Sequence, residues 1–85
     1  MQPTSHLETL LNHPRTTMKL QALIADLGRR VQLLDADIHE EEKRTGIFKV
    51  SDAAYPTLAR NLRARRNNLL ATITMLQRQL VEAVI

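Results

Sequence analysis

Four arginines in the second half of the sequence follow one stripe and could bind an anion. Arg60, Arg63 and Arg78 share the outer side of a predicted helix, and Arg65 lies beside them. Guanidinium groups spaced in this way can follow the phosphates of a nucleic acid. However, no aromatic residue is interleaved for base stacking, and no established DNA-binding motif is present. Glutamates 40–42 end the preceding segment and can neutralise part of the stripe. The sequence therefore favours a solvated, partly paired face, with nucleic-acid binding as the alternative.

Two further charged residues, Glu41 and Arg66, fall on the apolar faces of the two long segments. The apolar spacing of the first segment, continued past Ile38, reaches Glu41, and Arg66 interrupts the matching face of the second. If the chain reverses near Val50, these residues come within reach of one another, so we expect a half-buried ion pair. The pair either fixes the register of the segments or lines a charged pocket between them. No third polar group converges there, which favours register fixing.

The histidines and serines do not form a recognisable catalytic or metal-binding pattern. Asp35 and His39 are four residues apart, but they lie on the flank of their segment, and the inward Glu-x-x-His spacing of di-metal bundles is absent. His6 and His13 have no partner at metal-ligand spacing. The two serines, at positions 5 and 51, are typical helix caps without a neighbouring base. The sequence predicts no catalytic residue, no cofactor-binding residue and no metal ligand.

One enzymatic alternative is a small all-helical enzyme such as a chorismate mutase. Those enzymes are homodimers of about this length, with arginines lining a pocket inside the bundle. The present chain is similar in length and helicity only. Arg66 is the single arginine expected to point inward, so the set of inward charged residues is missing.

All of these charged groups are positioned by two long apolar seams. The first seam has the spacing 4-3-4-3-4, which is typical of one face of a helix that packs against another helix. It comprises Leu20, Ile24, Leu27, Val31, Leu34 and Ile38. The second seam follows the same spacing and comprises Leu62, Leu69, Ile73, Leu76 and Leu80. Two seams of this kind in a chain of 85 residues predict a single all-α domain built on a helical hairpin.

Capping and breaking residues predict the ends of the helices. A short helix is expected at about residues 5–12, where Ser5 opens a capping-box spacing. Pro14 precedes a long helix at about residues 15–45, and Gly46 suits the position just after its end. A linker at 46–53 and a second long helix at about 54–84 complete the chain. The short linker makes the two long helices antiparallel neighbours.

A hairpin of two helices buries only one stripe on each helix. Apolar residues beside the seams would then stay in water, namely Leu23, Leu58, Leu70 and Val84. An apolar face of this width suits a core of three or four helices. We therefore expect a second copy of the chain, giving a dimeric four-helix bundle or coiled coil.

The amino-acid composition excludes several classes of protein and of metal site. The chain has no cysteine, which excludes a disulfide scaffold and thiolate metal sites. Its longest uncharged run, residues 67–77, is about half of the ~20 residues that a membrane span requires, and no signal peptide is visible. A cytoplasmic protein without a membrane partner is expected.

The favoured function is a non-catalytic, self-associating protein-protein interaction module, such as an adaptor, small regulator or chaperone-like protein. The alternative is a DNA- or RNA-associated accessory protein that uses the arginine stripe.

Overall fold

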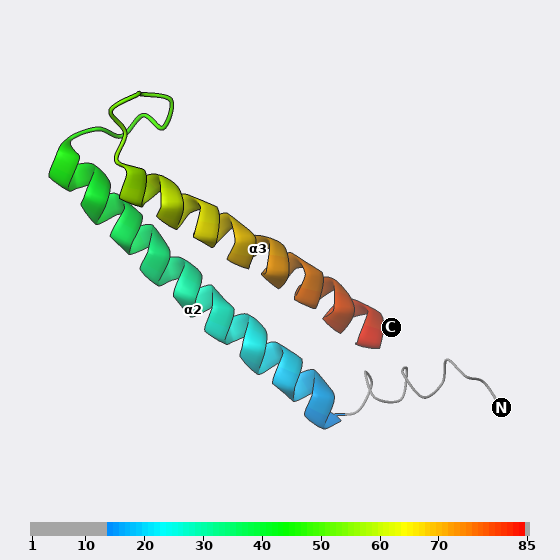
Figure 1. Cartoon of the computed structure of the whole chain (residues 1–85). Helices are drawn as coiled ribbons and strands as arrows, with labels where there is room; N and C mark the ends of the chain where they lie inside the picture. Colours follow the sequence, from blue (N-terminus) through cyan, green and yellow to red (C-terminus); the bar gives the residue numbers. More distant parts are fainter. Residues whose placement is uncertain (1–13, 85) are drawn as a thin grey trace.

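The structure, a computed structural model, describes residues 14–84 as two α-helices joined by a loop (Figure 1). Helix α2 spans Pro14–Thr45 and helix α3 spans Thr57–Val84. The helices run antiparallel and pack against each other, so the all-helical hairpin predicted from the two seams is confirmed. The short helix expected at residues 5–12 lies outside the described residues. The dimeric bundle stays a prediction, because the structure contains one chain.

The ends of α2 follow from its boundary residues. Pro14 occupies the first turn, where a missing backbone N–H leaves no helical hydrogen bond unmade. At the other end, the Gly46 N–H donates to the Glu42 carbonyl at 2.8 Å, and Gly46 has a φ of +73°. Glycine adopts this left-handed conformation without a side-chain clash. Lys43 and Arg44 in the last turn place positive charge where the helix dipole is negative.

Helix α3 begins at Thr57, three residues later than the predicted start at 54. The carbonyl of Pro56 accepts the first helical hydrogen bond, from the Arg60 N–H at 3.1 Å. The proline ring disfavours a helical conformation for the residue before it, here Tyr55. The helix therefore cannot extend upstream of the proline.

The loop between the helices, residues 46–56, is held by its own hydrogen bonds. The Asp52 carboxylate accepts from the Ala54 N–H at 2.8 Å, and the Asp52 carbonyl accepts from the Tyr55 N–H at 3.0 Å. Asp52 thus closes a turn inside the loop. The Thr45 hydroxyl accepts from the Ile47 N–H at 3.3 Å, which ties the start of the loop to the end of α2.

The core between the helices is thin and mostly aliphatic. Of the eleven seam residues, only Leu27, Ile38 and Leu76 are buried, and the other eight are half-buried. Ala59 and Ala83 are also buried, which allows the backbones to approach closely at both ends of α3. Among the residues whose burial is described, no large side chain is completely enclosed.

Many large apolar side chains remain in contact with solvent. They are Met18, Leu23, Leu33, Phe48, Val50, Leu58, Leu70, Met75 and Val81.

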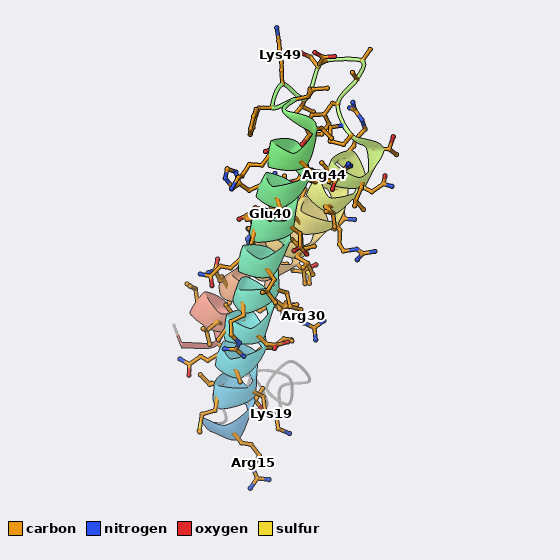
Figure 2. All side chains as sticks on the ribbon, turned by 90° about the vertical axis from the view of Figure 1, so that its left-hand side faces the viewer. Arg15, Lys19, Arg30, Glu40, Arg44 and Lys49 are labelled. Atoms are coloured by element: carbon orange, nitrogen blue, oxygen red, sulfur yellow. The ribbon has the colours of Figure 1, made fainter. Side chains whose placement is uncertain are left out.

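Figure 2 views the hairpin with α2 in front of α3 and shows Lys19, Arg30 and Lys49 extending into solvent. Neither helix contains a stretch apolar and long enough to cross a bilayer.

Candidate functional site

Three polar side chains meet at the end of the hairpin that carries the loop. The Tyr55 hydroxyl donates to Glu42 Oε2 at 2.7 Å, and Arg63 Nη2 donates to the same oxygen at 2.8 Å. Arg63 Nε donates to the Tyr55 hydroxyl at 2.7 Å, which closes a three-membered ring of hydrogen bonds. Glu42 and Tyr55 are buried, and the Arg63 side chain is 28% exposed. This polar cluster joins α2, the loop and α3 through directional bonds.

The aromatic ring of Tyr55 adds contacts with two arginines. The guanidinium carbon of Arg60 lies 5.4 Å from the ring centroid, and that of Arg63 lies 5.8 Å away. Arg60 Nη2 also donates to the Val50 carbonyl at 3.3 Å. Cations at this distance are attracted by the electron-rich ring face, so Tyr55 anchors the loop against the first turns of α3.

The polar cluster stabilises the charged forms of Glu42 and Arg63. The hydrogen bond from Arg63, followed by that from Tyr55, holds the pKa of Glu42 below its ordinary value, although burial acts in the opposite direction. The hydrogen bonds of Arg63 to Glu42 and to Tyr55 raise the pKa of Arg63. The ion pair is therefore intact at neutral pH, and it resists protonation in moderate acid.

The ion pair predicted between Glu41 and Arg66 does not form. Glu41 pairs with Arg44 one turn later on the same helix. Arg66 Nη1 instead donates to the Asp35 carboxylate at 3.0 Å, near the edge of the interface. The more deeply buried of the two inter-helix ion pairs joins Glu42 to Arg63.

Glu42 forms the pair in place of Glu41 because an alternating 4-3 spacing does not follow the period of a straight helix. An alternating 4-3 spacing selects the residue three after Ile38, which is Glu41. On a straight helix of 3.6 residues per turn, however, the residue four later is about 40° from Ile38 and the residue three later is about 60° away. Glu42 therefore faces α3 more directly. A count based on the straight-helix period could have found it.

The structure places the four arginines of the stripe in two different environments. Arg63 was expected on the outer face, but it lies one turn after the fully buried Ala59 and turns into the interface. Arg60 is engaged by the loop and by Tyr55. Arg65 and Arg78 are exposed, and the described part of the chain gives them no ion-pair partner.

A hollow of about 480 Å³ opens on one side of the hairpin near the loop. Its lining combines four charged residues of α2 with two leucines of α3, namely Asp37, Glu40, Glu41, Arg44, Leu58 and Leu62. Glu40 and Arg44 are labelled near the loop end of α2 in Figure 2. Three carboxylates against one guanidinium make the hollow acidic. With its leucine wall it suits a positively charged group on an apolar stem.

Among the described residues, no group of three or more histidine, aspartate and glutamate side chains is placed so that it could hold a metal ion. The three carboxylates of the hollow do not form such a group. Asp35, expected beside His39, pairs with Arg66. His6, His13 and Ser5 lie outside residues 14–84, and Ser51 is exposed in the loop. The polar cluster and the hollow are thus the two arrangements with a definable physical role.

Comparison with known proteins adds no assignment: no protein-family model matches the chain, and neither a curated protein nor a solved structure is significantly similar to it.

Proposed function

We propose that this protein is a non-catalytic interaction module that works by self-association, as an adaptor, small regulator or chaperone-like partner. The observation that carries the proposal is the incomplete burial of the seams. Eight of the eleven seam residues are only half-buried in the single chain. Covering apolar surface of this kind with a further helix removes it from water and stabilises the assembly.

A second copy of the chain is the simplest source of the missing helices. It brings two helices with the same apolar faces, and a two-fold arrangement lets both copies bury the same surface. Small helical domains commonly reach adequate stability through oligomerisation. The resulting four-helix bundle would cover residues that the hairpin leaves wet, such as Leu23, Leu58 and Leu70.

Size-exclusion chromatography with light scattering tests this proposal. We expect a mass of twice the 9.7 kDa of the chain at micromolar concentration. A monomer with full helical content, measured by circular dichroism on the same fractions, would defeat the proposal. The hairpin would then be stable without burying its seams further.

The exposure of Arg65 and Arg78 supports a second candidate, a basic accessory protein that binds DNA or RNA. A mobility-shift assay across salt concentration tests it, because phosphate contacts weaken steeply with salt. The appropriate variant is Arg65→Glu with Arg78→Glu, since these side chains take no part in the polar cluster. Salt-dependent binding that this double variant abolishes would favour the second candidate, and absence of binding at low salt would exclude it.

A further inference from the structure

We propose that the second copy docks on the side of the hairpin that carries the acidic hollow, with both hairpins pointing the same way. In this arrangement Arg65 of each copy meets Asp37 and Glu40 of the other. The inference rests on the proposed self-association and specifies which surface performs it.

An apolar band runs along this side. The hollow places Glu41 of α2 and both Leu58 and Leu62 of α3 on one side of the hairpin. Leu34 and Leu23 precede Glu41 by two and by five complete helical turns, so they share its side of α2. Two helical turns after Leu62, Leu69 extends the band along α3 in the same way. The members are thus Leu23, Leu34, Leu58, Leu62 and Leu69, all of them half-buried or exposed.

Unpaired charges of both signs border the band. Asp37 and Glu40 lie in the hollow on α2, and no ion pair within residues 14–84 engages them. Arg65 follows Leu58 by two helical turns on α3 and is also exposed and unpaired within the described chain. The acidic group is therefore on one helix of this side and the basic group is on the other.

These opposite charges lie at the same height along the hairpin. Asp35 of α2 pairs with Arg66 of α3, and Glu42 pairs with Arg63. Arg65 falls between the two arginines in α3. It is therefore level with the stretch of α2 between residues 35 and 42, which contains Asp37 and Glu40.

Symmetry then selects one arrangement. When two copies meet on this side about a two-fold axis parallel to the helices, α2 of each packs against α3 of the other at equal height. The guanidinium of Arg65 from the second copy then enters the acidic hollow, and its apolar stem lies against the leucine wall. A two-fold axis that lies in the interface and perpendicular to the helices packs α2 against α2 and α3 against α3, so the acidic residues of the two copies face each other and Arg65 stays away from them. Charge complementarity thus favours the parallel arrangement.

A charge-swap experiment tests this pairing. The first variant is Arg65→Glu, and the second combines Asp37→Arg with Glu40→Arg. Each variant alone opposes like charges at both symmetric contacts. We expect its dimer to dissociate at a concentration about tenfold higher or more than the wild type, as measured by sedimentation equilibrium at low salt. An equimolar mixture of the two variants restores opposite charges at both contacts, so we expect heterodimers of near wild-type affinity.

Controls separate charge pairing from other causes. Arg78→Glu changes the net charge by the same amount as Arg65→Glu at an exposed position of α3 outside the band, so we expect it to leave the affinity unchanged. Circular dichroism confirms that each variant retains its helices. Three results overturn this interface while self-association stands: variants that dimerise like wild type, an equal effect of Arg78→Glu, and no recovery in the mixture. A monomeric wild-type protein overturns the proposed function together with the interface.

Discussion

The two ends of the hairpin are held together by different chemistry. At the loop end, Glu42, Tyr55 and Arg63 form a closed ring of short hydrogen bonds next to the buried Ile38. At the open end, the buried contacts are aliphatic, and they include Leu27, Leu76 and Ala83. Figure 1 shows the loop end and the open end at opposite ends of the paired helices.

This difference separates register from stability. Hydrogen bonds have fixed partners and angles, so the polar cluster penalises any sliding of α3 along α2. Aliphatic side chains contribute free energy through burial, but a seam with a regular spacing can pair in more than one register. We infer that the loop end sets how the helices align and that the aliphatic seam supplies most of the free energy of unfolding.

The largest expected effect is therefore at the open end. Truncation of the buried side chain in Leu76→Ala should lower the free energy of unfolding by about 2–4 kcal/mol, because it removes apolar contacts and leaves a cavity. The matched control is Leu33→Ala, at a side chain that is 67% exposed, which should change it by less than about 0.5 kcal/mol. Urea unfolding followed by circular dichroism measures both. Equal losses would contradict the assignment of the seam as the main source of stability.

The two glycines should respond in opposite directions to alanine. Gly28 lies inside α2, and an added Cβ would meet no atom within 4 Å, so Gly28→Ala should stabilise the protein by about 1 kcal/mol. Gly46 has a φ of +73° at the end of α2, so Gly46→Ala should destabilise it by about 1 kcal/mol or more. Thermal unfolding of the two variants beside wild type gives the signs directly. A destabilised Gly28→Ala would contradict this expectation, because the single chain leaves room for the added Cβ.

Tyr55→Phe tests the polar cluster with a smaller expected effect. The change removes the hydroxyl and keeps the ring that Arg60 and Arg63 contact. Because Glu42 and Arg63 remain bonded to each other, we expect a loss of about 0.5–1.5 kcal/mol. A loss as large as that of Leu76→Ala would contradict this expectation and would show that the Glu42–Arg63 pair does not hold without the hydroxyl.

The smallest effect is expected from acid. The pKa of Glu42 is held below its ordinary value of 4.5 in the folded protein, so the stability it contributes is complete above that value. The contribution is lost as the pH falls through the lowered pKa of the folded state. The difference in free energy of unfolding between wild type and Glu42→Gln should thus shrink as the pH is lowered from neutral to below 4.5. A difference that stays constant across this range would contradict the coupling of Glu42 to Arg63.

Much of the fold was predictable from the sequence because its determinants are local. Apolar residues recur at three and four positions, and Pro14 and Gly46 mark the ends of α2. The start of α3, expected at about residue 54, lies at Thr57, because Pro56 disfavours a helical conformation for Tyr55.

The polar cluster was harder to predict because it joins three separate segments. An alternating 4-3 spacing selects Glu41, and only the straight-helix period of 3.6 residues per turn favours its neighbour Glu42. Arg63 reaches Glu42 across 21 residues of sequence, and Tyr55 takes part from a loop. Contacts of this kind depend on the path of the loop. Residue spacing within one helix carries no information about that path.

The concentration dependence of unfolding tests our claim that a second copy completes the half-buried seams. If folding and association are coupled, the midpoint of urea unfolding rises as the protein concentration increases over a hundredfold range. We predict that rise, together with a loss of helical signal when the protein is highly diluted. A midpoint that does not change with concentration, at full helicity throughout, would contradict the claim and identify the hairpin as a stable monomer.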